Sequence, residues 1–214
     1  RGIWAEAYLN GNVLQHQYLK ACVYFRHYID IPIHIPAGDP VFAYRLAWQQ
    51  TLFGDTPFYM IQNVPLLVQR NMISEGFGSS NTIRGVRENR ILAEGLAWAN
   101  LELRVKLVKF KLFNQYFYVA LNPFFDMGMV VQPYRLDNMN PLLVDRQIVA
   151  RGGDNLYTAN MFNTVVDEKL HMSAGAGLHV LMNQNFNISF EFGKCFDVND
   201  GTGLGINIGL NYIF

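Results

Sequence analysis

The carboxy-terminal residues alternate between apolar side chains and very small or amide side chains, and this pattern constrains the fold more than any other feature. Side chains of a β-strand point to opposite faces in turn, so a period of two predicts a strand with one apolar face. The second face here holds only Gly and Asn, whereas the solvated face of a soluble sandwich is normally rich in Lys, Glu and Thr. The apolar face comprises Leu204, Ile206, Ile208, Leu210, Tyr212 and Phe214, and the other face comprises Gly203, Gly205, Asn207, Gly209 and Asn211.

The same alternation recurs along the chain. Four upstream segments alternate regularly, and three segments near the amino terminus do so less perfectly. Each regular segment is close to the about 9–11 residues that a tilted strand needs to cross the hydrocarbon of a bilayer. We therefore predict an antiparallel meander of eight strands. These are residues 2–10, 18–30, 41–53, 97–107, 116–129, 171–182, 186–193 and 203–214.

Composition favours a chain whose outer surface meets lipid. Half of the residues are hydrophobic and only 16% are charged, whereas a soluble domain carries about 25% charged residues. The 17 Lys and Arg residues balance the 17 Asp and Glu residues, which argues against a nucleic-acid partner because such surfaces are basic. The prediction is an all-β fold, a transmembrane antiparallel β-barrel of a bacterial outer membrane, with apolar side chains toward lipid and polar ones toward a lumen.

The predicted connections fall into two classes. Outer-membrane barrels have short periplasmic turns and longer extracellular loops. We therefore place the long links outside the cell and the last residue, Phe214, on the periplasmic side. The short links are residues 31–40, 109–114 and 183–185, and the longer ones are 54–95, 131–167 and 196–202.

Four short motifs follow one another in the second half of the chain. Residues 76–90 read GFGSSNTIRGVRENR, residues 100–104 read NLELR, residues 124–130 read FFDMGMV, and residues 175–178 read GAGL. This ordered set resembles the BamA/TamA/FhaC superfamily of outer-membrane assembly and translocation barrels, in particular the carboxy-terminal half of the barrel. The resemblance covers most of residues 57–214, whereas the strands before it match only in general character.

The resemblance implies that the loop folds into the lumen and that Arg84 bridges Glu102 and Asp126. The residues support the same bridge, because alternation places both carboxylates on the inward face of adjacent strands. Two such carboxylates repel each other unless a cation lies between them. The fixed fork of donors on an arginine can bond to both. Gly85 would allow the backbone of the loop tip to approach the wall closely.

An alternative arrangement stays open from the residues alone. Glu102 could pair with Arg104 or Lys106 on its own strand, and Arg84 would then be solvated in an ordinary loop. The tip also departs from the resembled family, because the residue after Arg-Gly is Val86 in place of an aromatic. That departure leaves open how the tip packs and whether the family activity is retained.

The strand count is a further clue. Barrels of the resembled family have about sixteen strands, and their Arg-Gly loop precedes the last five, as it does here. The chain would then supply half of a wall, whose unpaired edges are not tolerated in lipid. An amino-terminal half could be absent from the sequence, two copies could close one barrel, or eight strands could close alone with the loop folded outward. The chain begins at Arg1 without an initiator Met or signal sequence, which suggests a processed protein or a piece of a longer one.

The resemblance implies outer-membrane protein insertion or translocation by strand templating and local membrane perturbation, with no covalent catalysis, cofactor or metal. The expected partners are the lipid bilayer, a second copy or a missing half-barrel, substrate outer-membrane proteins and periplasmic accessory proteins. We expect residues 1–214 to form one barrel domain with no periplasmic recruitment domain. The Gly-rich face of the last strand (Gly203, Gly205 and Gly209, ending at Phe214) would form a weak seam suited to β-augmentation, or would only fit a crowded lumen.

Two other functions are alternatives: a passive pore or structural barrel, and an outer-membrane hydrolase. His171 and His179 face inward in the predicted strands, but the sequence has no GxSxG or HExxH motif around its histidines. Polar lining of the lumen is therefore the preferred role for both. Cys22 and Cys195 lack metal-ligand spacing and are predicted to be unpaired thiols of the wall, although the sequence leaves their pairing open.

Overall fold

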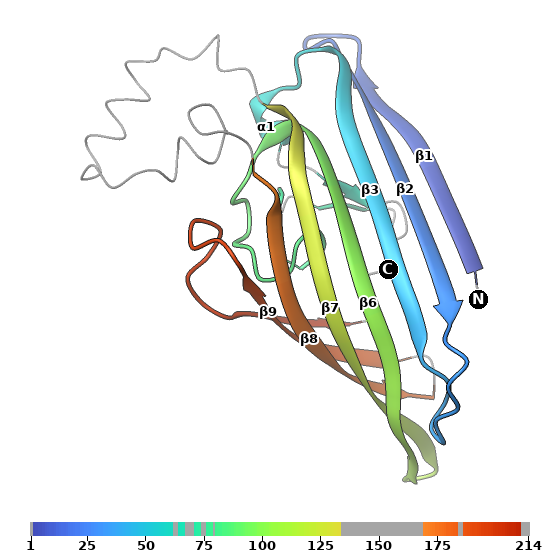
Figure 1. The fold of residues 1–214 in the computed structure, drawn as a ribbon. Helices are drawn as coiled ribbons and strands as arrows, with labels where there is room; N and C mark the ends of the chain where they lie inside the picture. The colour runs from blue at the N-terminus through green and yellow to red at the C-terminus, as the bar shows by residue number, and fades with distance from the viewer. Residues whose placement is uncertain are drawn as a thin grey trace.

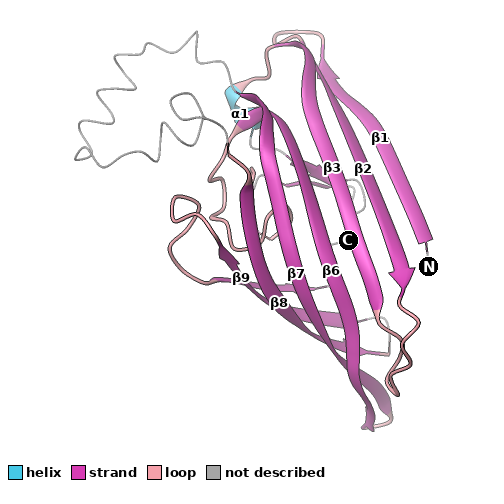
Figure 2. Ribbon diagram, in the orientation of Figure 1, coloured by secondary structure: helices cyan, strands magenta, loops and turns pink. Residues whose placement is uncertain are grey.

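The chain folds into an antiparallel sheet of eight strands in the order β1-β2-β3-β6-β7-β8-β9-β10. The computed structural model describes residues 2–61, 64–66, 71–73, 76–78, 80–133, 169–183 and 186–210. Strands dominate this part of the chain, as Figure 2 shows. The strands are β1 (Gly2–Asn12), β2 (Tyr18–Asp30), β3 (Val41–Gly54), β6 (Ala93–Leu112), β7 (Gln115–Pro133), β8 (His171–Met182), β9 (Phe186–Cys195) and β10 (Gly205–Leu210).

The sheet is strongly curled and open. β8 and β9 turn away from the direction of β1–β3, so the sheet forms a curved wall (Figure 1). Within the described ranges, β1 pairs with β2 alone and β10 with β9 alone, and no pairing joins the two ends. The arrangement in which eight strands close on themselves is therefore not the one observed.

The predicted all-β meander of eight strands is confirmed, with corrections at some ends. The link predicted at residues 109–114 is only two residues long, because β6 continues to Leu112 and β7 begins at Gln115. Phe113 and Asn114 form this turn with φ of 48° and 64°, the positive values that a tight hairpin turn requires. The last strand begins at Gly205, so Gly203 lies in the preceding loop.

Several predicted features lie outside the described residues. They include most of the link predicted at 131–167, two residues of the turn at 183–185, and the end of the last strand with Phe214. Parts of the link predicted at 54–95 also lie outside them.

Polar side chains are buried on one face of the sheet and apolar side chains are exposed on the other. On β3, the inner face places Arg45 at 0% exposure, while its outward neighbour Leu46 is 47% exposed. The exposed outward set includes Leu19, Val23, Leu46, Leu107, Met129, Leu178, Phe192, Ile206 and Ile208. The buried inward set includes Arg45, Gln49, Asn100, Glu102, Asn122, Asp126, Ser173, His179, Ser189 and Glu191. The outward face is thus apolar and exposed, and the inner face holds the buried polar side chains beside an apolar core.

The segment between β3 and β6 covers the inner face. It contains the short helix α1 (Phe58–Ile61) and a small sheet of β4 (Val64–Leu66) and β5 (Asn71–Ile73), which the sequence pattern did not predict. No helix in the described part of the chain has the length and apolar character to cross a membrane. Residues 76–78 and 80–92 then return against the inner face before β6 begins.

Apolar side chains of this returning segment make a core with the sheet. Phe77 packs edge-on against Trp98 of β6, with ring centroids 6.1 Å apart. Tyr24 of β2 contacts the same indole at 5.7 Å. Large buried aromatic side chains contribute most to such a core. Its buried members are Cys22, Tyr24, Ala47, Phe77, Ile83, Val86, Ile91, Ala93, Leu96, Trp98, Val130 and Cys195.

Candidate functional site

Arg84 occupies the tip of the returning segment and lies fully buried against the inner face of β6, β7 and β9. Its Nε and Nη2 donate to the two carboxylate oxygens of Asp126 at 2.7 and 2.8 Å. Its Nη1 donates to Glu102 Oε1 at 2.6 Å. The bridge predicted from the sequence is therefore present, and the arrangement in which Arg84 is solvated is not the one observed.

Three further contacts complete this arginine cluster, which comprises Arg84, Glu102, Asp126, Glu191 and Arg104. The backbone N–H of Arg84 donates to Asp126 Oδ2 at 3.0 Å. Glu191 of β9 accepts from Arg84 Nη1 at 3.1 Å. Arg104 donates from Nε to the second oxygen of Glu102 at 2.9 Å. Glu102 thus binds the loop arginine and Arg104 of its own strand at once, so it contacts its predicted partner Arg84 and one of the two alternative partners, Arg104.

The arginine cluster is also packed from one side by an aromatic ring. The Arg84 guanidinium carbon lies 3.6 Å from the centroid of Phe124, within the range of a cation–π contact. Charged groups in such a dry position are stable only when they are paired and hydrogen-bonded. The dense bonding around Arg84 meets that requirement, and it fixes the loop tip to three different strands.

A second buried arginine supports the loop main chain just before Arg84. Arg45 of β3 donates from Nε and Nη2 to Asn100 Oδ1 at 2.9 and 2.7 Å. Asn100 in turn donates to the carbonyl oxygen of Thr82 at 2.7 Å, and Arg45 Nη2 donates to the carbonyl oxygen of Asn81 at 2.5 Å. The loop main chain before Arg84 is therefore held by side chains of β3 and β6.

The loop tip touches β9 and β10 through glycine main chain. Gly85 has a φ of 88°, and a Cβ added to it would lie 2.6 Å from the carbonyl carbon of Gly193. A Cβ on Gly205 would lie 2.8 Å from the Cα of Gly85. Only residues without side chains permit this approach, so the predicted role of Gly85 is confirmed.

Two contacts hold the other end of the tip against the β9–β10 connection. The backbone N–H of Arg87 donates to the carbonyl oxygen of Asp200 at 3.0 Å. Arg90 Nε donates to the carbonyl oxygen of Asn199 at 2.5 Å. The Asp200 carboxylate also pairs with His171 Nδ1 at 2.7 Å. The tip is thus tied to the connection that precedes the last strand.

The remaining predicted residues have definite places. Val86 is buried in the apolar core although it is smaller than the family aromatic. Gly205 and Gly209 lie on the inner face of β10, whereas a Cβ added to Gly203 would meet no atom within 4 Å beyond its chain neighbours. Cys22 and Cys195 are both free and buried. His179 lies on the inner face 3.8 Å from Glu191.

Sequence reasoning did not assign Glu191, Arg45 or Phe124 to the site. Alternation did place Glu191 on the inward face, and that was the available signal for it. The same alternation applies to Arg45 and Phe124, because each lies an even number of residues from an inward-facing residue of its own strand. What the pattern did not show is how far around the curled sheet the tip of the loop reaches.

The arginine cluster is a structural tether. In the described residues, no group of three or more His, Cys, Asp or Glu side chains is arranged to hold a metal ion. Every carboxylate of the cluster accepts from an arginine, which leaves it poorly suited to moving protons. In comparisons with known proteins, no family model, curated protein or solved structure matches this chain. The site therefore has to be interpreted from its own geometry.

Proposed function

We propose that this chain is half of the wall of an outer-membrane β-barrel of the BamA/TamA/FhaC type, and that it assists the insertion or translocation of other proteins without covalent chemistry. The observation that carries the proposal is the buried arginine cluster on the inner face. A loop that returns across the sheet to place Arg84 between Glu102 and Asp126 is what the resemblance leads us to expect.

The reversed polarity of the sheet supports a membrane location. The outward face carries exposed Leu, Ile, Val, Phe and Met side chains along strands from β2 to β10. An exposed apolar area of this kind marks a surface that meets lipid or another protein. Since the polar side chains are enclosed on the opposite face, lipid is the environment that suits both faces.

The open edges support a wall completed by a second unit. β1 and β10 each carry one unpaired edge within the described residues. Unpaired backbone groups in hydrocarbon are unfavourable by several kcal/mol each, on the order of a lost hydrogen bond. A second copy of the chain, or an amino-terminal half of the wall, would satisfy them. The same edges are where a substrate strand would pair during templating.

The proposal is tested by a pair of substitutions at one outward position. Leu46→Lys is harmless to a sheet in water. If the proposal is right, it places a charge in lipid, which is unfavourable by about 2–4 kcal/mol near the bilayer centre. We expect Leu46→Lys to abolish insertion into phosphatidylethanolamine and phosphatidylglycerol vesicles, measured by heat-modifiable gel migration. Leu46→Phe is the matched control and should insert normally. A Leu46→Lys chain that folds as a monomer in water without detergent would refute the membrane location.

Activity is tested in the same vesicles. An unfolded outer-membrane barrel protein should fold faster in vesicles that contain the chain than in empty ones. Equal rates would contradict the assembly role and would leave a passive barrel. Native mass spectrometry of the detergent-solubilised particle then counts its copies: two copies support closure by a second copy, and one copy supports a separate partner half.

A further inference from the structure

The hairpin of β6 and β7 extends beyond β3 on one side of the sheet, whereas β7 stays paired with β8 as far as Phe117. The pairing of β3 with β6 ends at Val41 and Arg104, yet β6 continues to Leu112. From Val105 onward, β6 pairs with β7 on one side and with no strand on the other, within the described part of the chain. In the link between β2 and β3, a Cβ added to Gly38 would lie 3.0 Å from Lys106 Cδ. The hairpin end therefore has a free strand edge.

A bulge sets which side chains share a face of this hairpin. The register shifts between Lys106 and Val108, so Leu107 is an extra residue opposite β7. A bulge reverses the alternation beyond it. Lys106 and Lys109 are therefore on the same face although they are three residues apart.

One face of the hairpin end is cationic and aromatic. Lys109 Nζ lies 5.4 Å from the ring centroid of Tyr116 and 5.3 Å from that of Tyr118. Lys106 reaches Tyr118 at 5.4 Å, and Lys111 reaches Tyr116 at 5.4 Å. These five residues make up what we call the lysine face. The three lysines lie on one face of β6, so they would face alternate side chains of a strand added at this edge.

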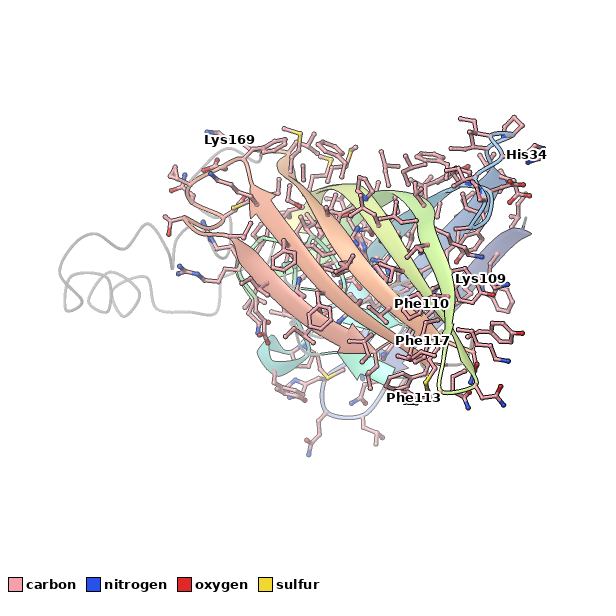
Figure 3. All side chains as sticks on the ribbon, turned by 90° about the horizontal axis from the view of Figure 1, so that it is seen from below. His34, Lys109, Phe110, Phe113, Phe117 and Lys169 are labelled. Atoms are coloured by element: carbon pink, nitrogen blue, oxygen red, sulfur yellow. The ribbon has the colours of Figure 1, made fainter. Side chains whose placement is uncertain are left out.

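The opposite face of the hairpin end is apolar. Phe110 stacks on Phe117 with ring centroids 5.4 Å apart and an interplanar angle of 9°. Phe113 at the turn is 87% exposed. Figure 3 shows these rings gathered at the end of the hairpin, with Lys109 beside them. This face continues the outward apolar surface of the sheet, so the lysine face points the other way.

The lysine face concentrates positive charge. No acidic residue lies between Glu102 and Asp126 along the chain. In the described ranges, no ion pair joins Lys106, Lys109 or Lys111 to a carboxylate. A strand edge with free backbone groups and a row of unpaired cations beside it offers two kinds of recognition at the same place.

The geometry points to a binding site for an extended polypeptide segment that adds as a strand along residues 105–112 of β6, with acidic side chains at alternate positions facing the lysine face. Main-chain hydrogen bonds supply affinity in this mode, and the alternate side chains supply specificity. An anionic lipid headgroup would pair with the lysines but would leave the backbone edge unsatisfied. The site goes beyond the proposed function and does not depend on barrel closure.

The test uses fluorescent peptides of about eight residues, the length of a typical strand, and the detergent-solubilised chain. A peptide alternating Glu and Val should bind in fluorescence anisotropy. The double variant Lys109→Glu, Lys111→Glu should weaken binding by about tenfold or more, since two favourable charge pairs become repulsive. Lys169→Glu is the matched control, because Lys169 lies away from the hairpin (Figure 3), and it should bind as tightly as the unmodified chain.

Two further probes separate strand addition from charge alone. The same peptide N-methylated at alternate residues keeps its charges but loses the backbone donors of one edge, so its binding should fall by a similar factor. An alternating Lys and Val peptide should not bind. Equal binding of the N-methylated peptide would overturn strand addition. Binding of short-chain phosphatidylglycerol, lost in the double variant, without any binding of the Glu and Val peptide would overturn the polypeptide site. Insertion assays are unaffected by either outcome, so the two proposals fail separately.

Discussion

The two halves of β6 differ sharply although one strand forms both. From Leu96 to Arg104 it lies between β3 and β7, and its inward side chains are buried beneath the returning segment. From Val105 to Leu112 it is paired only with β7, and most of its side chains are exposed. The same alternation therefore produces a packed wall in one half and an accessible ribbon in the other.

The difference lies in what covers the strand rather than in the strand itself. Residues 76–92 bring Arg84 and apolar side chains such as Phe77 onto the first half. Nothing comparable reaches the second half within the described residues. Stability should therefore be concentrated at the loop end of the sheet, and recognition at the hairpin end.

The largest effect should follow from removing the tether of the first half. Arg84→Ala leaves Glu102 and Asp126 buried without their cation, and breaking a buried pair in this way is unfavourable by about 3–5 kcal/mol. We expect a lower unfolding temperature in detergent and faster proteolysis within residues 76–92. Replacing the carboxylates as well, by Glu102→Gln and Asp126→Asn in the Arg84→Ala chain, should recover part of the loss. If the Arg84→Ala chain keeps the heat-modifiable gel migration and the protease resistance of the unmodified chain, the cluster does not hold the loop.

A matched pair of phenylalanines compares the two halves directly. Phe77 is completely buried against Trp98, so Phe77→Ala should destabilise the fold by about 3–5 kcal/mol. Phe110 is partly exposed and stacks only on Phe117, so Phe110→Ala should lose about 1 kcal/mol. Denaturant titration of both variants in one detergent measures the two losses of unfolding free energy. Similar losses of stability would show that the hairpin end is as well packed as the loop end, which would contradict the contrast between the two halves of β6.

The glycine contact allows a finer test of the loop end. Gly85→Ala would strain a positive φ and press a methyl group against Gly193, with an expected loss of about 1–3 kcal/mol. Gly203→Ala adds a methyl group in open space and should change stability by less than about 0.5 kcal/mol. The unfolding temperatures of the two variants, measured by thermal melts, test this difference in stability. A Gly85→Ala chain as stable as Gly203→Ala would show that the tip can move away from β9.

The smallest effect concerns the exposed link beside the hairpin. His34 Nδ1 lies 2.9 Å from Asp39, and this hydrogen bond and the negative charge raise the pKa of His34 above its ordinary value. Because the folded pKa is raised, the pair stabilises the link fully below the pKa of an unfolded histidine, about 6.5. The contribution is lost as the pH rises through the higher folded pKa. NMR titration should show a lower pKa for His34 in Asp39→Asn, and an unchanged titration would exclude the contact.

Much of this fold could be predicted because apolar outward residues and polar inward residues alternate so regularly. The predicted starts of β2, β3, β8 and β9 match the structure. Alternation also placed Glu102 and Asp126 on one face, and the resemblance of the ordered motifs then favoured the bridge to Arg84 over a solvated arginine. These are local properties of single strands, and a period of two records them directly.

The rest depends on contacts between distant segments, which no local pattern records. β4 and β5 are too short to show a period, so the small sheet was missed. Glu191 joins Arg84 only because the sheet curls enough to bring β9 within reach of a loop tip already bound to β7. The bulge at Leu107 was invisible for a different reason, since an inserted residue looks like an ordinary member of the run.

That single inserted residue determines the character of the hairpin end through its place outside the ladder. Because Leu107 has no partner on β7, Lys109 and Lys111 face the same side as Lys106. If Leu107 were taken into the ladder in strict alternation, the aromatic stack and the lysine face would exchange sides. A deletion of Leu107 would instead remove the bulge and leave both faces where they are, because the residues on either side of it already alternate in step with β7.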